Sequence, residues 1–369
     1  MNYQIDDPSL LVSPQLVFYE QQIDANIDKA ISDAGGSQRL WPHVKTHKCR
    51  EITLKLIDRG VTRFKCATIA ECEMVAECGA DSILLAYPLV GPNLLRFIKI
   101  QQAYPKVHWY ALFDDYDQLS KMDALLSISN SRLKIFIDVD TGLNRTGVPL
   151  DNVLEFVIRC RDLKNISVEG LHCYDGQNGI SSYELRLQTI EKLVEKEKEL
   201  KDRINEALGK DLMVIAGGTP EFPCYIRLSD FFCSPGTLFL QDNGYRNLFP
   251  DMKYEPAAAV MSRVISNPKP GHFTIDCGYK SISSDPGGVR GVIAGLEERT
   301  ESLFQNEEHW AFRMKQGYET FCPKVGDVLY IIPTHICPTC ALYQNAAVVN
   351  DGKVSAWWDI YARNRKITF

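Results

Sequence analysis

The sequence lacks several features that would place it in a specialised class of protein. It contains no apolar run of 18 residues, so no transmembrane helix is expected. It has no basic stripe interleaved with aromatic residues, and 41 Lys and Arg against 47 Asp and Glu give a net charge of −6, so nucleic acid is not an expected partner. Internal repeats and low-complexity linkers are also missing. We therefore expect a globular protein with neither a membrane nor nucleic acid as a partner.

The N-terminus lacks the basic and apolar regions of a secretion signal. Residues 1–7 read Met-Asn-Tyr-Gln-Ile-Asp-Asp, which predicts a cytoplasmic protein whose thiols stay reduced. The 12 cysteines are therefore expected to be free, and most of them lie among apolar residues, where cysteine serves as a small buried side chain. Only Cys337 and Cys340 have the CxxC spacing, and without a second such pair there is no zinc-ribbon signature.

Short apolar segments alternate with longer segments of helical character over the first two thirds of the chain. The motif Thr68-x-x-Glu71 predicts the start of a helix, and residues 183–208 form a long, charged amphipathic pattern. Strand and helix alternating eight times predict a (β/α)8 barrel, in which functional residues lie at the C-terminal ends of the strands. The eight strands are expected near residues 40–45, 62–67, 82–87, 107–113, 133–139, 167–173, 212–217 and 230–236.

The character of the sequence changes after about residue 250. The segments that follow are rich in Pro, Gly and Val and show few helical patterns, which predicts a second, mostly β domain. We expect the barrel to span residues 12–250 and the β domain to span residues 251–369 together with residues 1–11.

Polar and glycine residues follow several of the expected strands. Lys45 follows the first strand, where its amine could form a Schiff base with an aldehyde, or could be an ordinary loop lysine. Pyridoxal phosphate needs such a lysine, backbone N–H groups for its phosphate, a partner for its phenolic oxygen and a side chain stacked on its ring. Arg145, Tyr174 and glycine turns at 217–219 and 234–237 supply the last three, although each alone could be an ion pair, core packing or a tight turn.

A second candidate site lies in the expected β domain, where the pattern predicts an apolar strand that runs through His335 and Cys337. Two residues apart on a strand, these side chains are expected on the same face, where imidazole and thiolate form a soft site for zinc with open positions. A buried cysteine beside a capping histidine is an alternative. A redox pair of Cys337 and Cys340 is another, which we set aside because no strand-to-helix context that would lower the thiol pKa is expected there.

Five segments, taken in order, resemble the family of D-threonine aldolases and D-serine dehydratases, enzymes built on the alanine racemase type of pyridoxal phosphate fold. The resemblance covers nearly the whole chain, from about residue 8 onward. The segments are Pro42-His43-Val44-Lys45-Thr46-His47-Lys48, Asn144-Arg145-Thr146-Gly147, Gly217-Gly218-Thr219-Pro220, Ser234-Pro235-Gly236-Thr237 and His335-Ile336-Cys337-Pro338-Thr339.

The resemblance implies a role for each residue. Lys45 would carry the cofactor, Arg145 would contact its phenolic oxygen, and Tyr174 would stack on its ring. His335 and Cys337 would hold the metal, since the family uses a His-x-Cys or His-x-Asp pair for this. The phosphate would be held by Gly218, Thr219, Gly236 and Thr237.

Two residues bear on which reaction is expected. Ser234, which we count among the cofactor-binding residues, stands where racemases of this fold have an arginine that faces the pyridine nitrogen, which removes one reason to expect racemisation. Cys337 is similar to the dehydratase branch rather than to the classical aldolase branch. Further polar residues that we expect to line the pocket are His47, His172, Gln177, Asp276, Tyr279, Lys280 and Ser281.

The activity implied is that of a lyase acting on D-β-hydroxy-α-amino acids. If Lys45 removes the α-proton while the metal stabilises the departing hydroxide, an oxo acid and ammonia result, as in a D-serine dehydratase. If a metal-bound base deprotonates the β-hydroxyl, glycine and an aldehyde result, as in a D-threonine aldolase. We favour dehydration because of Cys337. An amino acid racemase and a non-catalytic pyridoxal phosphate carrier stay open as well, and the resemblance also implies a homodimer.

Overall fold

The computed structural model describes residues 3–368, which form two compact units. One unit, here called the β unit, comprises the residues up to Lys29, Thr46–Ile52 and Thr237–Arg363. The other, the barrel unit, comprises Ala30–Lys45, Thr53–Gly236 and the residues from Asn364 onward. The domain boundaries expected at residues 12 and 250 stay a prediction.

The barrel unit is built on a parallel sheet, and the expected (β/α)8 barrel is confirmed. The segment around residues 40–44 closes the ring of strands, because Leu40 forms a β-bridge with Cys233 of β9 (Phe232–Cys233) and His43 forms one with Lys65 of β2 (Arg63–Cys66). A short strand, β6 (Val148–Pro149), pairs with β5 (Leu133–Asp140) outside this ring. The ring strands, in spatial order, are β2 (Arg63–Cys66), β3 (Ser82–Leu85), β4 (His108–Phe113), β5 (Leu133–Asp140), β7 (Ile166–Cys173), β8 (Met213–Ala216) and β9 (Phe232–Cys233).

The segment expected as the first strand is present only as isolated bridges. Pro42 has no N–H group, so the ladder on this segment cannot be continuous. The Pro42 carbonyl still accepts the N–H of Lys65 at 2.9 Å, and the N–H of Val44 donates to the Lys65 carbonyl at 3.0 Å. The backbone therefore fixes the position of residue 45 beside β2 although no regular strand forms.

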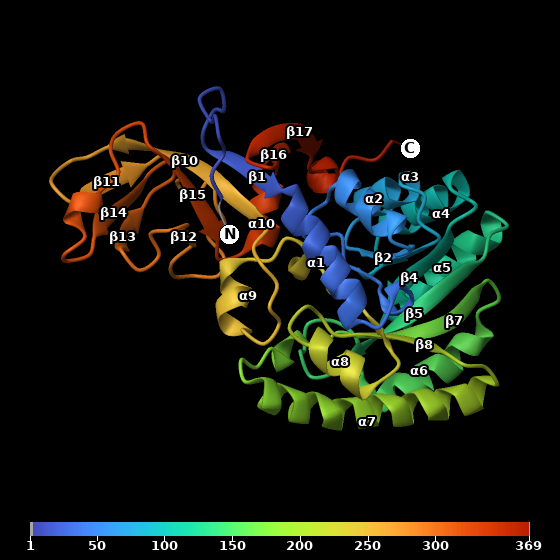
Figure 1. Ribbon diagram of the computed structural model, residues 1–369. Coiled ribbons are helices and arrows are strands. Elements are labelled where there is room, and N and C mark those ends of the chain that lie inside the picture. Colours follow the sequence, from blue (N-terminus) through green and yellow to red (C-terminus); the bar gives the residue numbers. More distant parts are fainter. Residues whose placement is uncertain (1–2, 369) are drawn as a thin grey trace. The chain divides into compact units, whose positions relative to one another are not determined.

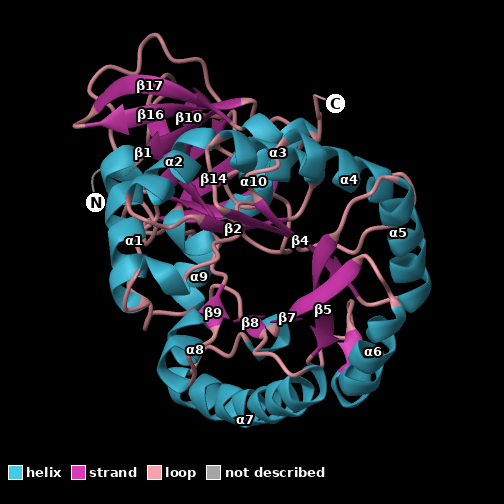
Figure 2. Ribbon diagram, turned by 90° about the vertical axis from the view of Figure 1, so that its right-hand side faces the viewer, coloured by secondary structure: helices cyan, strands magenta, loops and turns pink. Residues whose placement is uncertain are grey.

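Helices surround the strands of the barrel unit on the outside (Figure 2). The helix start predicted at Thr68 is confirmed, because the Thr68 hydroxyl accepts the N–H of Glu71 at 3.2 Å and the Glu71 carboxylate accepts the N–H of Ala67 at 2.6 Å. The long amphipathic helix ends at Gly209, which adopts a left-handed conformation. The helices of this unit are α3 (Ile69–Glu77), α4 (Asn93–Ala103), α5 (Tyr116–Ile128), α6 (Val153–Arg159), α7 (Tyr183–Leu208) and α8 (Phe222–Leu228), while α1 (Glu20–Asp33) and α2 (Arg50–Asp58) contribute residues to both units.

One layer of the barrel interior is filled by aromatic and aliphatic side chains. Trp41 packs edge-on against Tyr110 and lies 6.0 Å from Phe136, measured between ring centroids, and all three are buried. Leu84, Leu112 and Ile215 join the same cluster. Because these residues come from strands around the ring and touch one another, they occupy the centre of the barrel. This core is the usual packed layer of a closed barrel rather than a pore.

The β unit is a mixed sheet whose strands are labelled in Figure 1, and the expected mostly β domain is confirmed. Its N-terminal strand, β1 (Gln15–Tyr19), pairs antiparallel with β10 (Ala258–Ser266) and parallel with β16 (Asn345–Asn350). Its core includes Phe273, Trp310 and Phe312. The remaining elements are β11 (His272–Ile275), β12 (Gly291–Ile293), β13 (Thr300–Gln305), β14 (Trp310–Met314), β15 (Val328–Pro333), β17 (Lys353–Asp359), α9 (Asn243–Leu248) and α10 (Ile336–Leu342).

The expectation that His335 and Cys337 lie on one face of a strand is wrong. Strand β15 ends at Pro333, His335 is the N-cap of α10, and Cys337 lies in the first turn of that helix. Cys337 and Cys340 therefore do follow a strand-to-helix turn, and the absence of that context no longer counts against a redox pair.

None of the helices within residues 3–368 has both the length and the apolar character that a membrane span requires.

Candidate active site

The residues that the sequence singles out in the barrel unit follow the C-terminal ends of its strands. Lys45 follows the closing segment and its side chain is exposed. Its neighbour His43 lies with ring Nδ1 3.0 Å from the Lys65 carbonyl oxygen, which ties the segment to β2. Burial, together with the positive charges of Lys65 and Lys45, holds the pKa of His43 well below its usual value, so this ring is neutral.

Arg145 and Tyr174 lie together in the barrel unit. The guanidinium carbon of Arg145 is 4.8 Å from the centroid of the Tyr174 ring. The loop that carries Arg145 is shaped by Asp140, whose carboxylate accepts the N–H groups of Gly142 and Asn144 at 3.0 Å each.

Gly147 closes this loop and must be a glycine. Its N–H donates to the Asp114 carboxylate at 2.8 Å, and its φ of 110° lies in a region that other residues rarely adopt. A Cβ atom there would lie 2.5 Å from the backbone nitrogen of Asp140. The Asn144-Arg145-Thr146-Gly147 motif is therefore a loop geometry that places one arginine beside Tyr174.

The two glycine turns are joined by a hydrogen bond. The N–H of Gly236 donates to the hydroxyl of Thr219 at 3.1 Å, so the ends of β8 and β9 are held together. The N–H of Gly218 donates to the carboxyl group of Glu221 at 2.9 Å. Burial and the nearby Asp175 raise the pKa of Glu221 to about 8, so this group is mostly protonated at neutral pH and repels a phosphate little.

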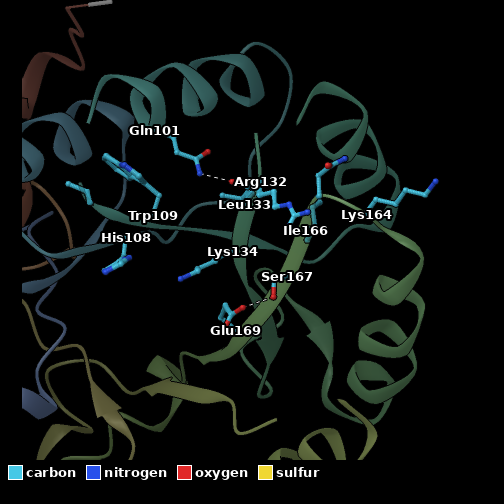
Figure 3. A pocket seen from close by; sticks show the side chains of 12 residues that line it. Gln101, His108, Trp109, Arg132, Leu133, Lys134, Lys164, Ile166, Ser167 and Glu169 are labelled. Carbon is cyan, nitrogen blue, oxygen red and sulfur yellow. Dashed lines mark hydrogen bonds between the residues drawn. The ribbon is translucent and has the colours of Figure 1, made fainter. Parts of the chain in front are cut away.

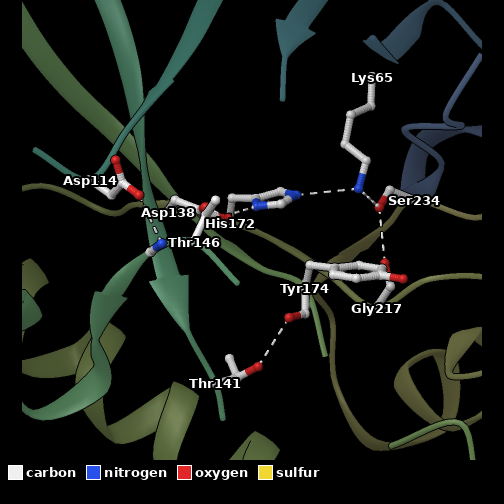
Figure 4. Close-up of polar contacts among 10 residues, drawn as sticks. Lys65, Asp114, Asp138, Thr141, Thr146, His172, Tyr174, Gly217 and Ser234 are labelled. Carbon is white, nitrogen blue, oxygen red and sulfur yellow. Dashed lines mark hydrogen bonds and ion pairs between the residues drawn. The ribbon is translucent and has the colours of Figure 1, made fainter. Parts of the chain in front are cut away.

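A chain of polar side chains crosses the barrel interior next to these turns (Figure 4). The Asp138 carboxylate lies 2.7 Å from Nδ1 of His172, whose Nε2 lies 3.3 Å from Nζ of Lys65. The Lys65 amine donates to the Ser234 hydroxyl at 2.5 Å, and that hydroxyl donates to the Gly217 carbonyl at 3.0 Å. All four side chains are buried.

The hydrogen-bond directions along this row of side chains follow from the groups at its two ends, the Asp138 carboxylate and the Lys65 amine. A carboxylate only accepts, so His172 donates from Nδ1 to Asp138 and must accept at Nε2 from Lys65. Burial lowers the pKa of His172, which agrees with a neutral ring. Burial alone would raise the pKa of Asp138, but the hydrogen bonds from His172 and Thr146 together with the nearby positive charges outweigh it and hold the pKa of that carboxyl below its usual value. The chain therefore begins with a carboxylate and reaches an amine.

The surroundings of Lys65 strongly perturb its ionisation. Burial is the main cause, and the charge of Lys45 adds to it, so that the pKa of Lys65 falls to about 7. Asp138 opposes this shift. The Lys65 Nζ atom also lies 5.8 Å from the centroid of the Tyr174 ring.

Sequence reasoning alone does not identify Lys65 and Asp138 as site residues, and it names His172 only as a pocket-lining group. A signal was available for Lys65. In Arg63-Phe64-Lys65-Cys66 the side chains alternate, and a lysine at the centre of a buried barrel strand indicates a functional group or a buried ion pair.

The remaining residues expected to line the pocket have varied surroundings. In the barrel unit, Gln177 donates to the Thr141 carbonyl at 3.1 Å, in the loop that leads to Arg145. In the β unit, the Asp276 carboxylate accepts the N–H of Arg263 at 2.9 Å, and Lys280 forms an exposed ion pair with Glu307 at 2.5 Å. These two β-unit contacts give Asp276 and Lys280 structural partners of their own. His47 is buried, Ser281 is half-buried and Tyr279 is exposed.

The two implied metal ligands, His335 and Cys337, lie in the β unit, as does Thr237. Cys337 Sγ lies 3.2 Å from the hydroxyl of Thr46 and 3.4 Å from that of Thr237. His335 Nδ1 lies 3.5 Å from the Asp285 carboxylate.

Both groups of this pair shift toward their charged forms. Burial would raise the pKa of Cys337, but the hydrogen bond and charge of His335 together with the hydroxyls of Thr237 and Thr46 outweigh it, and the pKa is lowered. Burial would likewise lower the pKa of His335, but Cys337 together with the carboxyl groups of Asp242 and Asp285 outweighs it, and the pKa is raised. Nitrogen and sulfur donors of this kind suit zinc. Within residues 3–368 no group of three or more His, Cys, Asp or Glu residues is placed to hold a metal.

A separate hollow opens at the opposite, N-terminal ends of β4, β5 and β7 (Figure 3). Its volume is about 360 Å³. Its walls include Trp109, Arg132, Lys134, Lys164 and Glu169, none of which belongs to the residues discussed above. In barrels of this type the reacting groups gather at the other end of the strands, so this hollow is not the candidate active site.

Two known families match successive parts of the chain. A family model described as the alanine racemase N-terminal domain matches residues 19–220, more than half of the chain. A second model, described as a putative serine dehydratase domain, matches residues 257–349. The two matches fall in the order in which the barrel strands and the later β strands occur.

The curated relatives match along most of their length. D-threonine aldolase of Arthrobacter sp is 26% identical over 88% of this chain and 85% of that protein. 3-Hydroxy-D-aspartate aldolase of Paracoccus denitrificans is 24% identical over 97% of this chain and 94% of that protein. D-serine dehydratase of Saccharomyces cerevisiae is 21% identical over 94% of this chain and 95% of that protein.

Solved structures show the same fold. D-threonine aldolase from Filomicrobium marinum matches with a TM-score of 0.86 and 20% identity over 96% of each chain. D-threo-3-hydroxyaspartate dehydratase from Delftia sp. HT23 matches with a TM-score of 0.81 and 21% identity over 95% of this chain and 97% of that one. The family expected from the sequence motifs is confirmed: this chain belongs to the family that carries the alanine racemase N-terminal domain, together with the D-threonine aldolases and D-serine dehydratases.

Proposed function

We propose that the protein is a pyridoxal phosphate- and metal-dependent lyase that acts on D-β-hydroxy-α-amino acids. One observation carries the proposal. Cys337 Sγ lies 3.2 Å from the hydroxyl of Thr46, and Thr46 directly follows Lys45 in the chain. Thr46 therefore connects the predicted cofactor lysine, through the polypeptide chain, with a predicted metal ligand. We infer that a small amino acid interacts with both.

Each residue has a role in this proposal. Lys45 binds the cofactor covalently and, once substrate has replaced it, its amine removes the α-proton. Arg145 and Tyr174 orient the cofactor ring through its phenolic oxygen and its face. The turns joined by the Gly236–Thr219 hydrogen bond would bind the phosphate, with Gly218, Thr219, Gly236 and Thr237 as the binding residues. The N–H groups of Gly218 and Gly236 donate to Glu221 and Thr219 in the cofactor-free protein, so a bound phosphate would replace those acceptors. The cofactor, when bound, stores the electron pair that is left on Cα.

His335 and Cys337 would hold a divalent metal, with zinc as the expected ion. The nitrogen and sulfur donors fit zinc, and two protein ligands leave positions for the substrate. The metal, when bound, is a Lewis acid toward the β-hydroxyl group. A similar solved structure supports a metal here, since it is described as a cysteine-to-alanine mutant of D-threo-3-hydroxyaspartate dehydratase "in the metal-free form".

Dehydration to an oxo acid and ammonia is the favoured outcome, because Cys337 occupies the second ligand position. Retro-aldol cleavage to glycine and an aldehyde is the second candidate, and the 26% identity to a D-threonine aldolase favours it. Racemisation is less well supported, since Ser234 stands where racemases of this fold carry an arginine.

The experiment that tests the proposal uses protein loaded with pyridoxal phosphate and zinc. It is incubated separately with D-serine, D-threonine and D-threo-3-hydroxyaspartate, with the L-isomers as controls. Keto acid and ammonia identify dehydration, while glycine with an aldehyde identifies cleavage. Exchange of the substrate α-deuterium without either product would identify a racemase, and no reaction with any substrate would leave a cofactor carrier.

We also propose that the protein is a cytoplasmic homodimer. All 12 cysteines are free thiols, which fits a reducing compartment. The family resemblance supports the dimer. Size-exclusion chromatography with light scattering tests this, since a single active species of 41.8 kDa would contradict it.

A further inference from the structure

The buried amine of Lys65 has no part in the function proposed above. Its side chain is 3% exposed, in the middle of β2, and a lysine is almost never buried without a specific partner. In that function Lys45 attaches the cofactor covalently, and the glycine turns bind the cofactor phosphate. The burial of Lys65 therefore calls for a role of its own.

The neighbours of Lys65 orient its amine rather than neutralise it. His172 accepts one N–H at 3.3 Å and Ser234 accepts a second at 2.5 Å, and both acceptors are uncharged. An ammonium group has three N–H donors, so one remains for a ligand, since no acceptor among residues 3–368 takes it. Asp138, the carboxylate at one end of this series of hydrogen-bonded side chains, is connected to Lys65 only through the His172 ring.

The charged groups that face Lys65 come from several elements of the barrel unit. Lys45, from the closing segment, and Arg145, from the loop after β5, are cations, whereas Asp138 of β5 and Asp175, after β7, are carboxyl groups. Burial raises the pKa of Asp175 to about 6. With Lys65 protonated, three cations face two carboxyl groups, an excess of positive charge that suits an anionic ligand.

We propose that Lys65 is a further cofactor-binding residue, whose amine takes up a proton when the anionic pyridoxal phosphate binds and, as an ammonium group, attracts it. This inference rests on the proposed function, because it assumes that the cofactor occupies the barrel unit near Tyr174. It predicts that part of the binding energy depends on pH through this single amine.

The proton uptake follows from the ionisation of Lys65 in the free protein. With a pKa of about 7, the amine is roughly one tenth protonated at pH 8. An anion placed nearby favours the ammonium form and raises that pKa. Binding at pH 8 therefore draws about 0.9 of a proton onto Lys65, and the affinity falls by up to about tenfold for each pH unit above 7.

Isothermal titration calorimetry tests this with 4′-deoxypyridoxine 5′-phosphate, which lacks the aldehyde and cannot react with Lys45. Titrations at pH 8 in buffers of different ionisation enthalpy give the number of protons taken up. We expect the wild type to take up about one proton more than Lys65→Met, and the variant to bind roughly 10- to 100-fold more weakly at pH 7. Lys134→Met, which changes an exposed lysine at the other end of the barrel, is the matched control and should behave as the wild type.

The outcomes separate this inference from the proposed function. Binding by both proteins with equal affinity and equal proton uptake overturns the role of Lys65 alone. No binding by the wild type overturns the proposed function and this inference with it. If near-ultraviolet circular dichroism shows that Lys65→Met does not fold, the wild type alone still decides, since an affinity that does not change between pH 6.5 and pH 9 rules the inference out.

Discussion

Replacing Lys65 by methionine should change how the stability of the cofactor-free protein depends on pH. Burial lowers the pKa of Lys65 from 10.5 to about 7 in the folded state, whereas the unfolded chain keeps the ordinary value. Between those two values the unfolded state binds more protons than the folded state, so the wild type gains stability as the pH rises. Below pH 7 both states carry the proton and this contribution is constant. Methionine has no such contribution at any pH.

The size of the effect follows from the same values. The difference between 10.5 and 7 is 3.5 pKa units, which corresponds to at most about 5 kcal/mol over the full range at ~1.36 kcal/mol per unit. From pH 7 to pH 9 the contribution amounts to about 2 kcal/mol. Because Lys65 is only 3% exposed, solvent screening removes little of it.

Urea unfolding at pH 7, 8 and 9, followed by tryptophan fluorescence under reducing conditions, measures this difference. We expect the free energy of unfolding of the wild type to rise relative to Lys65→Met by about 2 kcal/mol over that range. The same comparison for the exposed Lys134→Met should give a constant difference. Parallel pH profiles for the wild type and Lys65→Met would refute the reasoning, because they would mean that Lys65 titrates at its ordinary pKa.

Three further predictions concern other parts of the site. Lys45→Ala should abolish covalent attachment of the cofactor, so that borohydride reduction and denaturing mass spectrometry find no added mass, and retained label would assign attachment to another amine. Cys337→Ala should lower the affinity for zinc at least tenfold, as measured by metal analysis after dialysis. Cys340→Ala should keep the metal. Equal loss of zinc in both variants would mean that the two cysteines support the structure of this segment and that Cys337 is not a metal ligand. Gly147→Ala should lower the free energy of unfolding in urea by about 2 to 4 kcal/mol, because its Cβ would meet the backbone of Asp140. Gly209→Ala, at a position with a positive φ but open space, should cost only about 1 kcal/mol. Equal costs for the two variants would show that the close approach at Gly147 is relieved by a small backbone shift.

The barrel could be predicted because its strands carry a strong signal. Buried parallel strands are apolar on both faces and end abruptly in polar or glycine residues, so segments such as 133–139 and 212–217 stand out. The first segment is the exception. There Pro42 interrupts the hydrogen-bond ladder, and the sequence pattern of a strand is retained although the regular strand is not.

The start of α10 could not be predicted from the same kind of pattern. Ile336 and Cys337 continue the apolar character of β15, so the segment resembles more strand, and Pro338 argues against a helix at first sight. Proline is tolerated in the first turn of a helix, where its missing N–H has no partner to lose. The hydroxyl of Thr339 then donates to the His335 carbonyl at 2.8 Å within that turn.

The polar chain through His172 illustrates a different limit. Asp138, His172, Lys65 and Ser234 come from β5, β7, β2 and the end of β9, and their contacts depend on which side chains face inward and on the stagger between strands. Each residue has an ordinary alternative as a surface or core side chain. Only the assembled barrel brings one carboxylate, one imidazole and one amine close enough to form a continuous series of hydrogen bonds.

The pairing of β1 has a consequence for how the chain is made. Val17 lies opposite Ala259 on one side and Ala347 on the other, so this strand joins partners about 240 and 330 residues away. During synthesis β1 is translated before every other strand of its sheet, and about 330 further residues must be translated before its second partner exists. Throughout that interval its backbone groups are open to other nascent chains. Chaperone demand in the cell should therefore depend on this short N-terminal segment more than on the barrel, whose strands meet in the order of their translation.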